Sequence, residues 1–127
     1  MDETSTELLH LTQRLLDAIT GGDWETYEEL CDPTLTAIEP ESGGQLVEGM
    51  RFHRFYFDLG GIRGRPQTTM ANPHVRTLGD VAVVSYTRLI QQVDLEGNSS
   101  TLTTVETRVW QRQQGRWRNV HFHRSAL

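Results

Sequence analysis

The sequence predicts an α+β fold, in which a curved antiparallel sheet wraps around N-terminal helices and forms a cone with a pocket inside. Two observations carry this prediction. Apolar residues recur at helical spacing in the first half of the chain, and from about residue 67 onward the period falls to two, as in strands. The length of 127 residues suits one domain, which we take as residues 1–127.

The first predicted helix carries Leu8, Leu11 and Leu15 at spacings of three and four residues. Thr4 and Glu7 fit a capping box at its start, because a threonine hydroxyl and a glutamate three residues later can satisfy each other's free backbone N–H groups. Gly21 and Gly22 follow the apolar stretch and should end the helix. Glycine tolerates the left-handed conformation that ends many helices.

Three shorter elements should follow before the main sheet. A second helix is expected over residues 24–30, with Asp23 as its N-cap. Two short strands, over 35–38 and 45–48, flank a cluster of proline, serine and glycine and should form a hairpin. Aromatic residues at helical spacing predict a third helix over 50–59.

The second half of the chain reads as four long strands joined by turns that contain glycine. Their expected bounds are about 67–77, 80–94, 101–113 and 116–125.

Strand alternation places arginines from each of the last three strands on the same face of the sheet, among them Arg88, Arg108 and Arg124. If this face is concave, the pocket contains three guanidinium groups. The same alternation adds Tyr86, Glu106, Trp110, Arg118, Val120 and Phe122 to this face.

The three arginines allow two interpretations. Two cations about 7 Å apart repel by roughly 2 kcal/mol at an effective dielectric near 20, so the cluster needs negative partners. Glu106, with Glu39 or Glu41 from the hairpin, could supply them in a structural network. Alternatively, the pocket binds an external anion, and a carboxylate fits best because a planar guanidinium pairs with both of its oxygens.

The opposite face of the sheet is also partly apolar, whereas a monomer would show polar residues there. We therefore expect this face to meet another subunit, although the chain's own helices could cover it instead. Its apolar members are Val81, Val83, Leu89, Val93, Val105 and Val109.

Composition excludes several classes of function. The formal net charge is −5 and lysine is absent, which argues against nucleic-acid binding. No apolar run is long enough to span a membrane, and the acidic start does not resemble a secretory signal, so we expect a cytoplasmic protein. Cys31 is the single cysteine, and His121 with His123 lacks a third ligand at a recognisable spacing, so we expect no metal and no cofactor.

Several separate motifs, in order along residues 7–125, make the sequence similar to one family. They include Leu46-Val47-Glu48-Gly49, Phe52-His53-Arg54-Phe55-Tyr56-Phe57, Asn72-Pro73-His74-Val75, Glu106-Thr107-Arg108-Val109-Trp110 and the closing run from Asn119 to Ser125. Together they resemble the association (hub) domain of calcium/calmodulin-dependent protein kinase II, here as a standalone protein. The glycine-rich stretch 59–65 departs from the family pattern.

The resemblance implies the fold called nuclear transport factor 2-like, also known as SnoaL-like or cystatin-like. It implies no catalytic activity, assembly into homo-oligomers from dimers to rings, and a basic pocket that takes small carboxylates. The family's pocket arginines fall on Arg88, Arg108 and Arg124, and its pocket histidine falls on His53.

The expected function is therefore a non-catalytic, self-associating domain that binds a small organic anion. The three arginines would pair with the anion, and His53 would add a donor that titrates near neutral pH. Tyr86, Trp110, Phe52 and Tyr56 are the candidate walls. The alternative is an isomerase, dehydratase or polyketide cyclase in the same pocket, with Glu106 or Glu39 as the base facing Tyr86, although a carboxylate beside arginine is a weak base.

Overall fold

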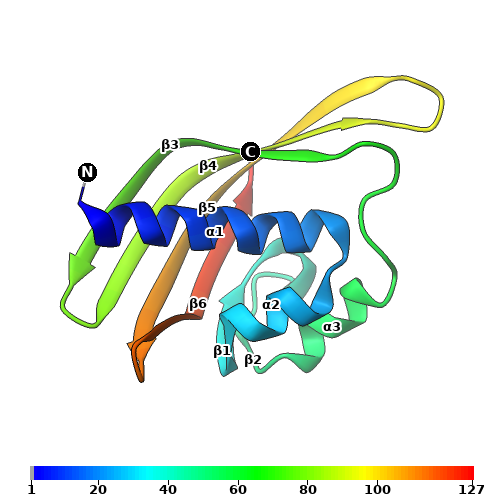
Figure 1. Ribbon diagram of the computed structural model, residues 1–127. Coiled ribbons are helices and arrows are strands. Elements are labelled where there is room, and N and C mark those ends of the chain that lie inside the picture. Colours follow the sequence, from blue (N-terminus) through cyan, green and yellow to red (C-terminus); the bar gives the residue numbers. More distant parts are fainter. Residues whose placement is uncertain (1) are drawn as a thin grey trace.

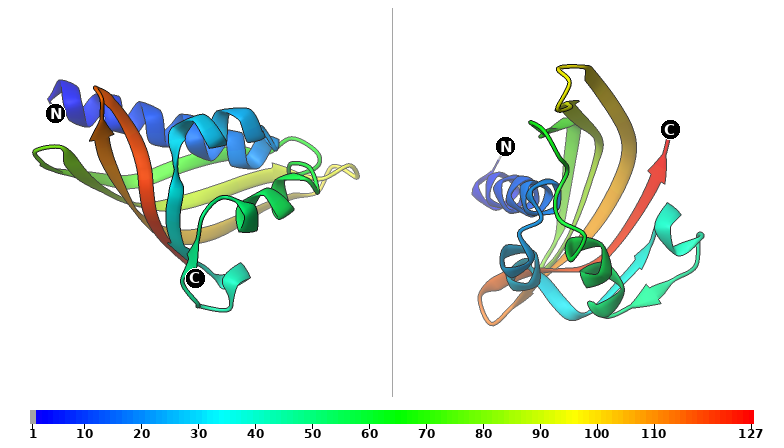
Figure 2. Two further views of the ribbon diagram at one scale, coloured as in Figure 1. Left: turned by 90° about the horizontal axis from the view of Figure 1, so that it is seen from below. Right: turned by 90° about the vertical axis from the view of Figure 1, so that its right-hand side faces the viewer.

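Three helices lie on one side of a curved six-stranded sheet in the computed structural model, which describes residues 2–127 (Figure 1). Figure 2 shows the sheet bending around the helices, and the turn between the fourth and fifth strands projects beyond them. In chain order the elements are α1 (Glu3–Gly21), α2 (Trp24–Leu30), β1 (Cys31–Ile38), the 3-10 helix η1 (Pro40–Ser42), β2 (Val47–Glu48), α3 (Arg51–Phe57), β3 (Gln67–Leu78), β4 (Val81–Val93), β5 (Ser99–Gln113) and β6 (Arg116–Ala126).

The strands are ordered β2-β1-β6-β5-β4-β3 across the sheet. All neighbours pair antiparallel except β1 and β6, which run parallel with Thr36 opposite His121. The α+β class and the curved sheet are thus confirmed, but the prediction of a wholly antiparallel sheet is wrong at this pairing. The chain crosses from β1 to the far edge of the sheet, and three hairpin reversals then bring β6 back beside β1 in the same direction.

Helix α1 packs its leucines against the inner face of the sheet. Leu8, Leu15 and Leu16 are fully buried within the core cluster that also holds β4 and β5 side chains. The helix begins earlier than predicted, because the carboxylate of Asp2 accepts the backbone N–H of Ser5 at 2.7 Å. An Asp2 cap therefore replaces the predicted Thr4–Glu7 box.

The short elements follow the prediction with small changes of length. Asp23 caps α2 by accepting the backbone N–H of Thr26, as predicted. Helix α3 is shorter than the predicted 50–59. Strand β1 starts earlier, at Cys31, and its pairing with β6 is interrupted between Cys31 and Thr36, a stretch that contains Pro33. Proline has no N–H to donate to a ladder, which accounts for the interruption.

The predicted alternation is confirmed along the parts of β4 and β5 that contact the core. Inward even positions of β4 are buried from Ala82 to Ile90, and those of β5 from Thr104 to Trp110. In β6 the alternation breaks, because Trp110 pairs with Asn119 while Val109 pairs with His121, leaving Val120 as an extra residue.

This bulge corrects the predicted face of β6. Before it, the buried residues are the odd-numbered Trp117 and Asn119, and after it the buried residue is Phe122. The predicted inward positions Arg118 and Val120 are only half-buried.

No helix in residues 2–127 has the length and apolar character needed to cross a membrane.

Candidate functional site

A pocket of about 300 Å³ opens between the end of α1, helix α3 and the inner face of the sheet. Its charged lining residues come from β4, β5, β6 and the hairpin around η1, while the helices supply His53 together with aliphatic and aromatic walls. The lining residues are Ile19, Tyr27, Glu39, Glu41, His53, Tyr56, Phe57, Ile62, Arg88, Ile90, Leu102, Arg108, Phe122 and Arg124.

The guanidinium of Arg108 is fully buried and all of its nitrogens are engaged. Nε donates to the Tyr86 hydroxyl at 2.9 Å, Nη1 to Oδ1 of Asn119 at 2.9 Å, and Nη2 to Oε1 of Glu106 at 3.2 Å. Its guanidinium carbon also lies 4.2 Å from the centre of the Phe122 ring. Burial alone would lower the pKa of Arg108, but the neighbouring Tyr86 and Glu106 raise it, so the group stays charged.

Glu106 is the common acceptor beneath this pocket. Besides Arg108, it accepts from the Tyr86 hydroxyl at 2.6 Å and from Arg88 Nη1 at 3.4 Å. Burial opposes its ionisation, but the charges of Arg108 and Arg88 outweigh burial and lower the pKa of Glu106. Glu106 therefore remains a carboxylate, and neither it nor Tyr86 is among the lining residues.

Arg88 lines the same pocket in a different state from Arg108. Only 3% of Arg88 is exposed, yet within residues 2–127 its side chain makes a single hydrogen bond, from Nη1 to Glu106 at 3.4 Å. Nε and Nη2 of Arg88 have no hydrogen-bond partner within residues 2–127. Burial lowers the pKa of Arg88, and Glu106 offsets part of that effect.

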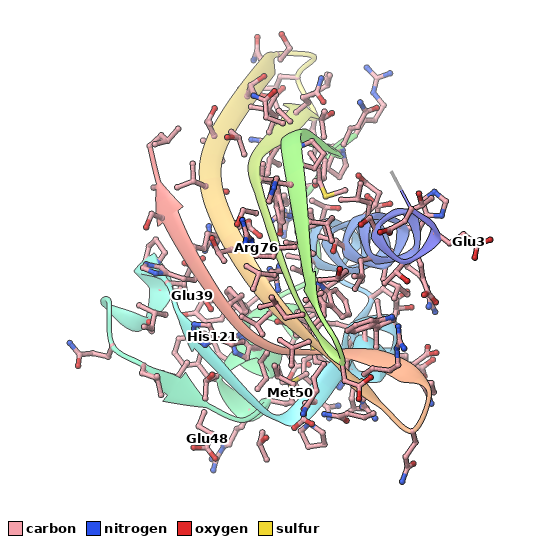
Figure 3. All side chains as sticks on the ribbon, turned by 90° about the vertical axis from the view of Figure 1, so that its left-hand side faces the viewer. Glu3, Glu39, Glu48, Met50, Arg76 and His121 are labelled. Carbon is pink, nitrogen blue, oxygen red and sulfur yellow. The ribbon has the colours of Figure 1, made fainter. Side chains whose placement is uncertain are left out.

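Arg124 is paired with two carboxylates of the hairpin. Its Nη2 lies 3.3 Å from Oε1 of Glu39 and also contacts both carboxylate oxygens of Glu41. Burial would lower the pKa of Arg124, but Glu41 and Glu39 raise it. Figure 3 shows Glu39 at the end of β1, on the opposite side of the molecule from Glu3 of α1.

His53 is buried on α3, with Nδ1 3.5 Å from Oε2 of Glu39. Burial and the nearby charge of Arg108 lower the pKa of His53 to about 4. Burial likewise raises the pKa of Glu39. His53 is thus neutral at pH 7, and the prediction that it titrates near neutrality is wrong. Its Nε2 has no hydrogen-bond partner in the described part of the chain.

The structure brings together most, but not all, of the residues predicted to bind a ligand. Arg88, Arg108, Arg124, His53 and Tyr56 line the pocket. Trp110, Tyr86, Glu106 and Phe52 are not among its lining residues, and Trp110 is instead fully buried in the core. A binding role for any of these residues stays a prediction.

Sequence reasoning missed Asn119, which helps to hold Arg108 in place. Its amide nitrogen donates to the carbonyls of Val109 and His121 while its oxygen accepts from Arg108. Simple alternation turns this position outward, and only the bulge at Val120 turns it inward. No signal in the sequence marks that bulge.

Comparison with known proteins gives the same family at the level of sequence and of structure. A model of the calcium/calmodulin-dependent protein kinase II association domain matches residues 4–127. The chain is 50% identical over 123 residues to the calcium/calmodulin-dependent protein kinase type II subunit delta of Oryctolagus cuniculus, a match that covers 94% of this chain and 23% of that protein. The chain therefore spans less than a quarter of the length of the curated relatives it matches.

Solved structures extend the comparison to the fold. The association domain of the C. elegans kinase superposes with a TM-score of 0.90 at 48% identity, covering 97% of this chain and 95% of that one. A nuclear transport factor 2-like superfamily protein from Salmonella enterica superposes with a TM-score of 0.76 at 25% identity, covering 97% and 92%. With its pocket framed by helices on a curved sheet, the chain belongs to the calcium/calmodulin-dependent protein kinase II association domain family and has the nuclear transport factor 2-like fold.

Proposed function

We propose that this association domain assembles with copies of itself and that its pocket binds a small organic carboxylate without converting it. The observation that carries the binding proposal is the state of Arg88. It is a buried, pocket-lining cation with two nitrogens that have no partner in residues 2–127. Arg88 pairs with Glu106 through Nη1 alone, whereas every nitrogen of Arg108 donates to a protein atom and Arg124 pairs with both Glu39 and Glu41.

The two free nitrogens of Arg88 match the geometry of a carboxylate. Nε and a terminal nitrogen of a guanidinium form a fork that donates two parallel hydrogen bonds to two oxygens. A buried donor without a partner costs about 1–3 kcal/mol, and a bound carboxylate would recover that cost. Arg88 is therefore the anchor of the proposed site, and Arg108 is part of its framework.

The other lining residues set the character of the ligand. Ile19, Phe57 and Ile62 supply apolar walls, and the neutral imidazole of His53 adds an uncharged polar contact. A short aliphatic chain that carries one carboxylate meets both requirements.

The environment of Glu106 supports binding rather than catalysis. A general base needs a pKa near the working pH and access to its substrate. Glu106 has a lowered pKa, is enclosed by Arg88, Arg108 and Tyr86, and does not line the pocket. The enzyme alternative therefore lacks one of its two proposed bases.

The binding proposal is tested by isothermal titration of the protein with butyrate and its longer homologues. We expect Arg88→Gln to weaken the best ligand by at least about tenfold, the scale of one charged bidentate contact. Arg88→Lys, which keeps the charge but loses the fork, should weaken it similarly. The matched control is Arg76→Gln, because Arg76 is exposed on β3 and does not line the pocket.

Circular dichroism checks that each variant is folded. Unchanged affinity in both folded Arg88 variants, or the absence of carboxylate binding to the unmodified protein, would contradict the proposal.

Self-association is supported by the outer face of the sheet. Val81, Val83, Leu89 and Val109 are only half-buried there, and Val105 is 37% exposed. An antiparallel sheet with one solvated face normally carries polar residues on it. Sedimentation equilibrium should give a mass of at least twice 14.5 kDa, and a strict monomer at tens of micromolar is incompatible with this proposal.

A further inference from the structure

A second hollow adjoins the pocket on the far side of Arg124. This outer groove has a volume of about 750 Å³ and lies between η1, the start of β5 and the end of β6. The pocket and the outer groove share three lining residues, Glu41, Leu102 and Arg124. The contact between Glu41 and Arg124 therefore stands at the boundary between the two spaces.

The charges around this boundary are balanced. The three pocket arginines face three carboxylates. Glu106 forms ion pairs with both Arg88 and Arg108. Glu39 and Glu41 serve Arg124. An anion that reached Arg124 would have to replace one of these two carboxylates, because a third negative charge on this guanidinium would be repelled by both of them.

Glu41 is the carboxylate that can leave. Its side chain is 37% exposed, against 9% for Glu39, so it can rotate into water and keep its charge solvated. The turn that carries it is held by its own hydrogen bonds. The single proton of the Ser42 hydroxyl is within reach of the Glu39 carbonyl at 2.8 Å and of the Gln45 carbonyl at 2.7 Å, and the backbone N–H of Gly43 donates to the Pro40 carbonyl at 3.0 Å. Releasing Glu41 from Arg124 therefore leaves these bonds of the turn intact.

We infer that Glu41 is an internal carboxylate that occupies the anion position on Arg124, and that an elongated dicarboxylate binds across the pocket and the outer groove by displacing it. One ligand carboxylate pairs with Arg88 and the other replaces Glu41 on Arg124. This inference rests on the proposed carboxylate binding at Arg88. It adds a second anion position, which the chain closes with its own side chain.

A tethered competitor has a definite consequence for affinity. A group on a short tether acts at an effective concentration in the millimolar range. Glu41 therefore lowers the affinity of any ligand that has to bind Arg124. A monocarboxylate held by Arg88 does not meet that penalty. Removing the charge of Glu41 should therefore favour dicarboxylates over monocarboxylates of the same length.

The test measures dissociation constants by isothermal titration on the full chain. The probes are straight dicarboxylates from succinate to suberate and the matching monocarboxylates from butyrate to octanoate. In Glu41→Gln we expect the best dicarboxylate to bind about tenfold tighter, equivalent to about 1.4 kcal/mol, and its matched monocarboxylate to change by less than about threefold. The double variant Glu41→Gln/Arg124→Gln should lose the gain.

Glu48→Gln is the matched control. Glu48 is exposed in β2 of the same hairpin, so this change alters the net charge equally but lies outside the shared boundary. The same gain in Glu48→Gln, or an equal gain for both classes of ligand, would show a general charge effect and overturn the inference. Unchanged dicarboxylate affinity in Glu41→Gln would also overturn the inference. Glu41→Ala checks that the glutamine side chain does not itself occupy Arg124 in place of Glu41.

The outcomes separate this inference from the function on which it rests. If monocarboxylates bind through Arg88 and Glu41→Gln changes nothing, only the displacement of Glu41 is wrong. If binding is independent of Arg88, the proposed function is wrong. If no probe binds to the unmodified protein or to Glu41→Gln, both are wrong.

Discussion

At the scale of single residues, the buried charges depend on Glu106. Its side chain is fully buried and accepts from Arg88, Arg108 and Tyr86 at once. A buried ion pair adds little stability relative to an apolar pair, but removal of one partner leaves the other charge buried and unpaired. Removing the charge of Glu106 should therefore destabilise the fold whether or not a ligand binds.

Glu106→Gln should lower the free energy of unfolding by about 3–5 kcal/mol at pH 7. The folded-state pKa of Glu106 lies below its ordinary value of 4.5, so its stabilising effect is present above pH 4.5 and is lost as the pH falls through the folded-state value. The deficit of the variant should therefore shrink on acidification. Urea unfolding at pH 7 and at about pH 4, at one fixed protein concentration, measures both effects.

The control for this variant is Glu96→Gln. Glu96 is exposed in the turn between β4 and β5, and its loss should change the free energy of unfolding by no more than about 0.5 kcal/mol. A Glu106→Gln deficit that is small at pH 7, or that grows as the pH falls, would contradict the account of Glu106 as a buried carboxylate.

At the scale of elements, alternation in the sequence predicts the inner faces of β4 and β5 because those strands are regular. The residue pattern alone therefore places Arg88, Arg108 and Glu106 together. The pattern does not show which arginine has a hydrogen-bond partner for every nitrogen. Arg108 reaches that state partly through Asn119, and the orientation of Asn119 follows from the bulge at Val120. Alternation also does not predict the parallel pairing of β1 with β6. The relative direction of two strands depends on the path of the whole chain rather than on the local residue pattern.

The loop after α3 shows the same limit. Its glycines predict only a mobile loop, yet Gly61 lies against the end of α1, and the N–H of Ile62 donates to the Thr20 carbonyl at 2.8 Å. A Cβ atom on Gly61 would sit 2.6 Å from that carbonyl oxygen and 2.6 Å from the carbonyl carbon of Gly21. Glycine is needed here for close approach of two backbones, which composition alone does not reveal.

Gly61→Ala should therefore destabilise the protein by about 1–3 kcal/mol, because the loop and α1 must separate to admit the methyl group. The shift would also displace Ile62 from the pocket wall. Gly21→Ala is the matched control, since a Cβ there has no neighbour within 4 Å and alanine is the better helix former. Thermal melting should give a lower melting temperature for Gly61→Ala than for Gly21→Ala. Equal melting temperatures would refute the close-approach argument.

At the scale of the whole molecule, the two faces of the sheet have separate tasks. The inner face holds the core and the pocket, while the outer face carries half-exposed valines and leucine that no helix covers in the described chain. This division would allow the proposed ligand binding and the proposed self-association to occur together, because each uses a different face of the sheet.

The outer face can be tested through Val105, which lies opposite Thr87 of β4 and Ser125 of β6. If copies meet on this face, Val105→Lys must bury an unpaired ammonium group, and the assembly should dissociate at concentrations at least about tenfold higher than for the unmodified protein. Leu95→Lys is the control, because Leu95 is 80% exposed in the projecting β4–β5 turn, away from this face. Sedimentation velocity over a range of concentrations measures both variants. If Leu95→Lys dissociates the assembly and Val105→Lys does not, the interface lies at the projecting turn and not on the outer face. The reason is that a lysine disrupts association only where the partner excludes water from it.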